Sequence, residues 1–147
     1  MTIREKLEAD YKTALVAKDA LKVSVIRMLK SSVQKSELSK KKEISDDDTI
    51  SIIQASIKQR KESIEQYTKG NRADLAGQEE AEMKILETYL PPQLSEDEVR
   101  KLVEQAVKDT GALTAKDTGK VMGKLMPLVK GKTDGSTVSR VVREFLK

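Results

Sequence analysis

The sequence contains no cysteine, no histidine and no tryptophan. Without cysteine the chain can form neither a disulfide framework nor a thiolate metal site. Without histidine it lacks the commonest general base and the commonest transition-metal ligand of proteins. Ser32-x-x-Lys35 and Ser39-x-x-Lys42 match a serine–lysine pattern only formally, because both fall in a charged helix end without partner motifs. We therefore expect no catalytic residue, no metal and no cofactor.

Aromatic residues are also scarce, at 3% of the chain. The four of them stand at or near apolar helix positions, so we expect no exposed platform on which single-stranded bases would stack. No apolar run approaches the roughly 18 residues of a membrane-spanning helix. The first ten residues lack the apolar stretch of a signal peptide. We expect a cytoplasmic protein with no membrane partner.

Charged residues are abundant at 35% of the chain, against about 25% in typical domains. The apolar residues between them recur every three or four positions, which indicates amphipathic helices throughout. Capping patterns of the Ser/Thr-x-x-Asp/Glu type mark helix starts at Thr2, Ser45, Ser95 and Thr114. Further N-caps are predicted at Asp19 and at Asp134 or Ser136, with a left-handed stop at Gly70 and a helix end at Gly111.

Pro91-Pro92 is the strongest candidate for a boundary, because proline has no amide hydrogen and pushes the preceding residue out of helical geometry. The sequence therefore predicts an all-α fold in two parts. An elongated helical hairpin or bundle over residues 1–90 is followed by a compact three-helix domain over residues 95–147. Pro127 is expected to end or kink a helix of the second part.

Positive charge gathers at the C-terminal end. Residues 120–147 carry seven Lys or Arg and two Asp or Glu, an excess of five positive charges. This is either a solvated basic surface or the footprint of a polyanion. The candidate RNA-binding residues are Lys120, Lys124, Lys130, Lys132, Arg140 and Arg143.

Glycines cluster in the same region. Each glycine in a helix interior costs about 1 kcal/mol relative to alanine, and Gly119 and Gly123 lie on one helix face. Either another helix or the phosphate of a ligand is expected to approach that backbone closely. Gly131 and Gly135 bound a turn, and Asp134 there occupies the helix N-terminus that would attract a phosphate. Lysine side chains are therefore expected to hold any polyanion.

Two chemical motifs are set aside. Gly131-Lys132-Thr133 looks like the end of a phosphate loop, but Met126 stands where the first glycine of that motif belongs. Glu79 and Glu82 share a helix face and are expected to pair with Arg72 or with a neighbouring helix, in preference to acting as an acid–base couple.

The spacing Gly123-x-x-Met126-x-x-x-x-Gly131-Lys132 resembles the tail of the B subunit of tRNA-dependent amidotransferases. With Lys58-Gln-Arg-Lys-Glu-Ser-Ile-Glu65, Arg72-x-Asp74-Leu75 and Tyr89-Leu-Pro-Pro-Gln-Leu-Ser95, the whole chain resembles the YqeY family, which shares that tail. After Lys132 the chain reads Thr-Asp-Gly where the tail usually has Ala-Asn-Pro. The resemblance implies a helical module that contacts tRNA, with catalysis elsewhere.

Three functions follow as expectations. The first is a tRNA-binding or tRNA-associated accessory module. The second is a helical protein–protein adaptor without RNA binding. The third is a non-catalytic component of an amidotransferase assembly or of the aminoacyl-tRNA machinery. The resemblance links the chain to carbon–nitrogen ligases that use glutamine as amido-N-donor, but the chain alone is not expected to catalyse that reaction.

Overall fold

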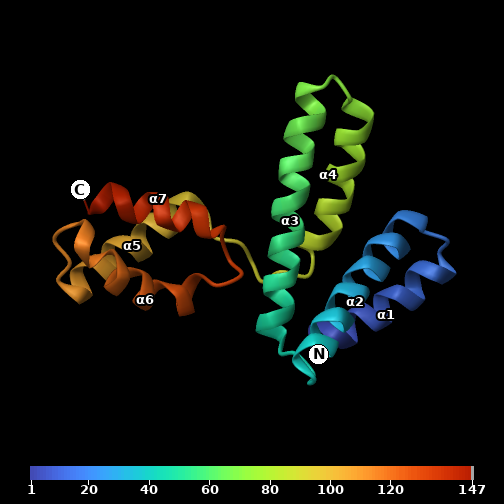
Figure 1. Ribbon diagram of the computed structural model, residues 1–147, viewed down its shortest axis with the longest axis horizontal. Helices are drawn as coiled ribbons and strands as arrows, with labels where there is room; N and C mark the ends of the chain where they lie inside the picture. Colours follow the sequence, from blue (N-terminus) through green and yellow to red (C-terminus); the bar gives the residue numbers. More distant parts are fainter. Residues whose placement is uncertain (147) are drawn as a thin grey trace. The chain divides into compact units, whose positions relative to one another are not determined.

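The computed structural model describes residues 1–146, and over these residues it contains seven α-helices, one short 3-10 helix and no β-strand (Figure 1). This confirms the all-α prediction. The helices are α1 (Ile3–Val16), α2 (Ala20–Lys40), α3 (Asp46–Lys69), α4 (Ala73–Glu87), α5 (Glu96–Thr110), η1 (Ala115–Asp117), α6 (Thr118–Val129) and α7 (Gly135–Phe145). The chain divides into two compact units, Met1–Leu90 and Pro91–Lys147.

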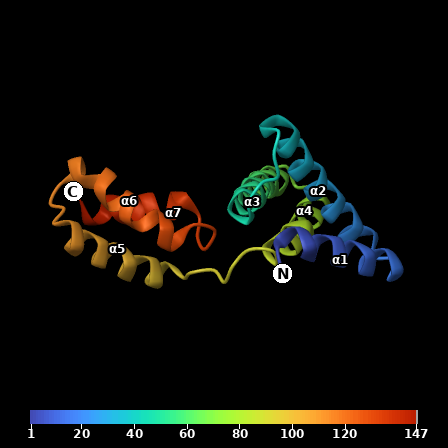
Figure 2. The ribbon, with the colours of Figure 1, turned by 90° about the horizontal axis from the view of Figure 1, so that it is seen from below.

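The N-terminal unit consists of two helical hairpins, α1–α2 and α3–α4 (Figures 1 and 2). The predicted caps begin its helices: Thr2 Oγ1 accepts from Glu5 N at 3.1 Å, and Ser45 Oγ accepts from Asp48 N at 3.2 Å. Asp19 likewise caps α2. Each cap satisfies a backbone N–H that has no partner inside its helix.

All four helices of this unit contribute to a single core, and Tyr89, which follows α4, is buried in it. The buried residues are Leu7, Val25, Ile26, Leu29, Ile53, Ile57, Leu86 and Tyr89. The Tyr89 hydroxyl donates to Asp10 Oδ2 at 2.5 Å and so ties the end of the unit back to α1. Burial, and then this hydrogen bond, raise the pKa of Tyr89.

One helix end differs from expectation. Gly70 has φ −86°, and the left-handed residue after α3 is Asn71, with φ 57°. Asparagine tolerates this region because its short polar side chain can bond locally. Pro127 lies inside α6, which continues to Val129, so of the two expected effects of this proline a kink stays a prediction.

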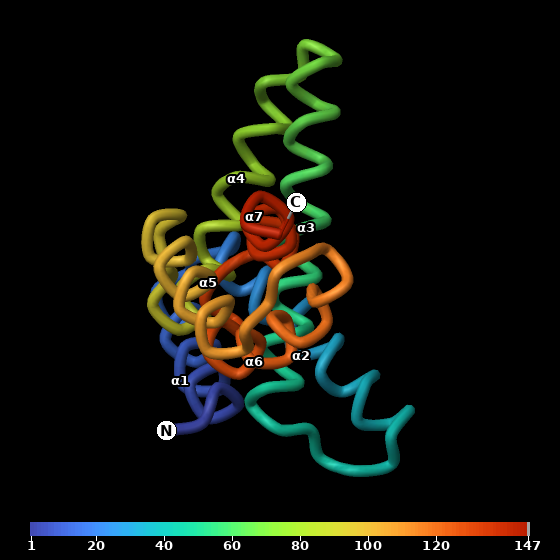
Figure 3. Tube along the Cα trace, turned by 90° about the vertical axis from the view of Figure 1, so that its left-hand side faces the viewer, coloured from blue at the N-terminus to red at the C-terminus, as the bar shows by residue number. Residues whose placement is uncertain are grey.

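The C-terminal unit packs α5, α6 and α7 around a core made mainly of valine (Figure 3, in which α7 is seen nearly end-on). Its buried residues are Val99, Val103, Ala106, Ala112, Val121, Leu125, Val129, Val138, Val141, Val142 and Leu146. Ser95 forms its predicted capping box with Glu98, and Gly111 ends α5 at φ 67°. None of the helices over residues 1–146 is both long enough and apolar enough to cross a membrane.

Candidate nucleic-acid interface

The loop between α6 and α7 is held by the segment that follows the two prolines. The side-chain amide of Gln93 donates from Nε2 to the carbonyl oxygen of Gly131 at 2.8 Å. The backbone N–H of Leu94 donates to the carbonyl oxygen of Lys132 at 2.7 Å. The two sequence motifs that carry the resemblance, Pro-Pro-Gln-Leu and Gly-Lys, therefore bind each other directly. Sequence reasoning missed this pairing, because the two motifs lie almost forty positions apart.

Gly131 is buried and adopts φ +77°, a backbone conformation that L side chains rarely take. The loop needs glycine there for this reason. Lys130 is exposed and Lys132 is half-buried. Within residues 1–146 neither lysine has an ion-pair partner. The backbone of the loop is thus fixed while its two ammonium groups are unneutralised.

The N-terminus of α7 is already occupied by a carboxylate, as the sequence predicts. Asp134 Oδ1 accepts from Ser136 N at 3.0 Å, so the helix dipole there is compensated. Gly135 opens the helix, and a Cβ atom built on it would meet no described atom within 4 Å. A phosphate at this end of the molecule would therefore bind the lysines and not the helix terminus.

Arg140 belongs to a network of four charges between α5 and α7. It contacts Glu96 at 2.5 Å and Glu144 at 3.2 Å, while Arg100 contacts Glu144 at 2.7 Å and Glu96 at 3.4 Å. Hydrogen bonding to Arg140 lowers the pKa of Glu96, and hydrogen bonding to Arg100 lowers the pKa of Glu144. The two positive and two negative charges cancel.

Arg140 and Arg143, both candidate RNA-binding residues, therefore differ in their surroundings. Arg143, one turn along α7, is exposed and has no ion pair among the residues described. On α6, Lys124 lies 3.4 Å from Asp109 and Lys120 lies 4.0 Å from Asp117. The structure thus divides the six candidate cations into two groups. Lys120, Lys124 and Arg140 have carboxylate partners, whereas Lys130, Lys132 and Arg143 have none within residues 1–146.

Gly119 and Gly123 lie on the exposed side of α6. A Cβ atom built on either glycine would meet no described atom within 4 Å. The reason is that α6 packs on its core through the opposite face, with Val121, Leu125 and Val129. Helix packing within the described chain therefore does not account for the glycine pair. Approach of an external partner to this backbone stays a prediction. Met126, which completes the glycine motif, is 43% exposed.

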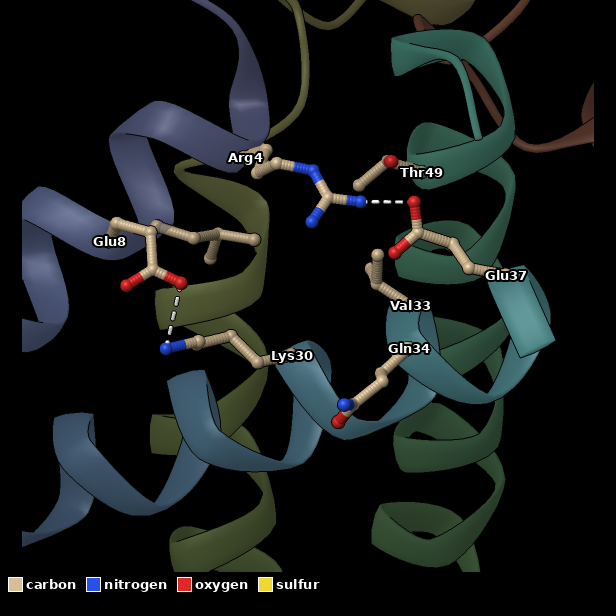
Figure 4. A pocket seen from close by; sticks show the side chains of 8 residues that line it. Arg4, Glu8, Lys30, Val33, Gln34, Glu37 and Thr49 are labelled. Atoms are coloured by element: carbon tan, nitrogen blue, oxygen red, sulfur yellow. Dashed lines mark hydrogen bonds and ion pairs between the residues drawn. The ribbon is translucent and has the colours of Figure 1, made fainter. Parts of the chain in front are cut away.

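A second candidate region is a cavity of about 370 Å³ in the N-terminal unit, between α1 and α2 (Figure 4). Arg4 binds Glu37 across it, and Lys30 lies 2.8 Å from Glu8. Hydrogen bonding to Arg4 lowers the pKa of Glu37, and hydrogen bonding to Lys30 lowers the pKa of Glu8. Every charged group that lines this cavity has an opposite partner. The arrangement is explained by closure of the α1–α2 hairpin and leaves no carboxyl group suited to act as a general acid.

Residues 1–146 hold no group of three acidic side chains close enough to bind a metal ion. The fold and the loop define a class: a helical chain of two compact units, one of which presents a fixed loop whose two lysines have no ion-pair partner among the residues described. The chain belongs to the family described as Yqey-like protein, whose profile matches residues 4–146. This confirms the resemblance on which the expectations rest.

Fungal relatives named "Altered inheritance of mitochondria protein 41, mitochondrial" match much of the chain. The protein from Vanderwaltozyma polyspora is 38% identical over 118 residues, which cover 76% of this chain and 64% of that protein. The proteins from Pyrenophora tritici-repentis and Lachancea thermotolerans are 31% and 33% identical, and each match covers 79% of the relative. The chain thus spans slightly under two thirds of the first of these relatives.

These names correct one expectation. The relatives are named as mitochondrial proteins, which contradicts the prediction of a cytoplasmic location. That prediction rested on the absence of a signal-peptide pattern and of a membrane-spanning apolar run, and neither absence tells the cytoplasm from the interior of an organelle.

Proposed function

We propose that this chain is an accessory module that binds tRNA through a basic surface of its C-terminal unit, centred on the loop between α6 and α7. The observation that carries the proposal is the pairing of a fixed loop backbone with two unneutralised lysines, Lys130 and Lys132. A loop that is already ordered loses little conformational entropy when it binds. The resemblance to the amidotransferase tail supports tRNA as the polyanion.

The charge pattern sets how strongly salt should weaken binding. When a cation leaves a carboxylate to bind a phosphate, the carboxylate takes up a counterion, so fewer counterions are released on net. Lys130, Lys132 and Arg143 should therefore contribute most of the salt dependence of binding. With about three phosphates neutralised, the logarithm of the affinity should fall with the logarithm of salt at a slope of about −2 to −3. Such contacts position a nucleic acid but do not read its sequence, so different tRNAs should bind alike.

The exposed face of α6 supports RNA as the form of nucleic acid. Pro127 has no amide hydrogen to donate to the carbonyl oxygen four residues earlier, which is that of Gly123. Gly119 and Gly123 place no side chain on that face of α6, and a Cβ atom built on either would meet no described atom within 4 Å. A ribose 2′-hydroxyl can donate to such a carbonyl, and deoxyribose lacks this group.

The test is a fluorescence-anisotropy titration of labelled tRNA with the full chain at several salt concentrations. Lys130→Ala combined with Lys132→Ala should flatten the slope by about 1.5–2 units, because two phosphate contacts are lost. The matched control is Lys120→Ala combined with Lys124→Ala, which removes the same charge from neighbouring positions that already have carboxylate partners. It should change the slope less. Neither pair should move the melting temperature noticeably, because none of the four lysines is buried and surface lysines contribute little to stability.

Two outcomes would contradict the proposal. If the control pair abolishes binding while the loop pair binds normally, the surface is misplaced. If the wild-type chain fails to bind tRNA at low salt, the function as a protein–protein adaptor should replace the proposed function in tRNA binding. Ammonia transfer from glutamine that appears only when amidotransferase subunits are added would support the third function, a component of that assembly.

A further inference from the structure

The side-chain amide of Gln93 is held in one orientation by two backbone carbonyl groups. Its Nε2 atom lies 2.8 Å from the carbonyl oxygen of Gly131 and 2.8 Å from the carbonyl oxygen of Pro91. A carbonyl oxygen only accepts hydrogen bonds, so the amide nitrogen, which carries the hydrogens, has to face both of them. The chemistry of these neighbours therefore fixes which way the amide points.

The oxygen atom of the same amide has no partner within the described chain. Among residues 1–146 no donor bonds to Gln93 Oε1, and the residue is exposed. An amide oxygen has two lone pairs that can accept hydrogen bonds. Because Nε2 is bound to two carbonyl groups, the side chain offers a ligand an acceptor and not a donor.

This acceptor lies beside the two lysines of the proposed tRNA surface. Gln93 binds the carbonyl oxygen of Gly131, which is the residue between Lys130 and Lys132. The backbone N–H of the following residue, Leu94, binds the carbonyl oxygen of Lys132 at 2.7 Å. A phosphate held by either lysine would therefore bring its own nucleotide close to the Gln93 amide.

The chemistry of the acceptor indicates which part of that nucleotide it contacts. A phosphate oxygen without a proton only accepts, so it cannot bond to Gln93 Oε1. The ribose 2′-hydroxyl can donate, and it is attached to the carbon next to the one that carries the 3′-phosphate. Every ribonucleotide has this hydroxyl and no deoxyribonucleotide does, which is how a protein distinguishes the two nucleic acids at a given site.

We propose that Gln93 accepts a hydrogen bond from the 2′-hydroxyl of a nucleotide whose phosphate binds Lys130 or Lys132. This contact makes Gln93 a specificity-determining residue, which selects RNA over DNA without distinguishing one RNA sequence from another. The inference rests on the proposed function, because the amide meets a ribose only when a nucleic acid occupies the two lysines.

The experiment compares two fluorescently labelled hairpins by anisotropy titration with the full chain. One is RNA, and the other has the same sequence with 2′-fluoro in place of every 2′-hydroxyl, so the phosphates and the A-form geometry stay while the donor is lost. The wild-type chain should bind the RNA about fivefold more tightly, since one hydrogen bond contributes about that much. Both hairpins should show the same salt dependence, because their phosphate contacts are the same.

Gln93→Met tests whether this residue is the source of the preference, because methionine has a similar length and no amide oxygen. The variant should bind the RNA about fivefold more weakly than the wild type does, bind the 2′-fluoro hairpin as before, and keep the salt dependence of both. Gln105→Met is the matched control, since Gln105 is an exposed glutamine of α5 that bonds to Asp109, and it should leave the ratio of the two affinities unchanged.

The two ligands separate recognition of the hydroxyl from support of the loop. If Gln93→Met weakens both hairpins equally, Gln93 only positions the loop and the inference is wrong. It is also wrong if the wild-type chain binds both hairpins equally, a result that needs no variant to fold and leaves the basic surface in place. Failure of the wild-type chain to bind either hairpin at low salt would instead overturn the proposed function itself.

Discussion

Each unit of this protein contains an arginine that contacts two glutamates, and the two clusters differ mainly in burial. In the N-terminal unit Arg60 is 9% exposed at its side chain, and its glutamate partners are 24% and 14% exposed. In the C-terminal unit Arg100 and its partners Glu96 and Glu144 are 39–48% exposed, and Arg140 joins them as a second cation. The buried cluster has an excess negative charge, whereas the exposed one is neutral.

The difference in burial indicates what each cluster does in its unit. A buried cluster excludes water, so the loss of one of its charged partners has a high cost. An exposed cluster is well screened, and its main effect is to subtract charges from the surface. The buried cluster of the N-terminal unit therefore bears mainly on stability. The exposed cluster of the C-terminal unit bears mainly on which surface charges remain without a partner among the described residues.

The largest expected effect is on the buried cluster. Arg60→Ala leaves Glu79 and Glu82 without their cation and should lower the free energy of unfolding of the N-terminal unit by about 3 kcal/mol. The measurement is chemical denaturation of the full chain, with NMR signals assigning the loss to α3 and α4. NMR signals of the C-terminal unit should persist, because the units are compact by themselves.

Arg100→Ala is the matched control, since it also removes an arginine from two glutamates. Its effect on unfolding should be much smaller, because water replaces the lost contacts and Arg140 still faces both carboxylates. Equal losses for the two variants would show that burial does not distinguish the clusters.

Helix starts were the most predictable part of this protein, because a cap is a local feature. Thr2, Asp19, Ser45, Ser95 and Asp134 all cap helices as their patterns indicate. Helix ends were less predictable, since Asn71 rather than Gly70 takes the left-handed conformation. The hydrogen bond between Gln93 and Gly131 could not be predicted from the sequence, because hydrogen bonds between distant loops leave no periodic pattern of residues. Ion pairs such as Arg140 with Glu96 were missed for the same reason.

A smaller effect, opposite in sign, is expected on α6. Gly123→Ala should raise the free energy of unfolding of the C-terminal unit by about 0.5–1 kcal/mol, because alanine favours the helix and the added methyl group meets no neighbour. Thermal denaturation provides the measurement. A loss of stability would show that a contact is made there after all.

The same position separates stability from binding. Gly123→Leu should also be accepted by the fold, but its side chain would cover the backbone turn that the proposed RNA approaches. Affinity for tRNA should then fall while the unit stays folded. Unchanged affinity would remove the α6 face from the proposed surface and leave the loop at Lys130 and Lys132 as its centre.

The smallest expected effect is a pH dependence that arises from the exposed cluster. The pKa values of Glu96 and Glu144 are lowered in the folded protein, chiefly by hydrogen bonds to Arg140 and Arg100. Groups with lowered pKa values stabilise the fold above the ordinary glutamate pKa of about 4.3, and this contribution is lost as the pH falls through their folded-state pKa values. Glu96→Gln combined with Glu144→Gln should therefore melt slightly below the wild type at pH 7, and the difference should shrink as the pH falls through the lowered folded-state pKa values. Glu104→Gln, which removes an exposed carboxylate that contacts Lys108 on its own helix, is the control for the loss of a surface charge. The double variant also frees Arg100 and Arg140 from their partners, so its affinity for tRNA at pH 7 should rise and its salt dependence should become steeper.

Tighter binding together with a lower melting temperature would show that these ion pairs limit the basic surface while they hold α5 against α7. A double variant that binds tRNA no more tightly than the wild type would place Arg100 and Arg140 outside the RNA-binding surface.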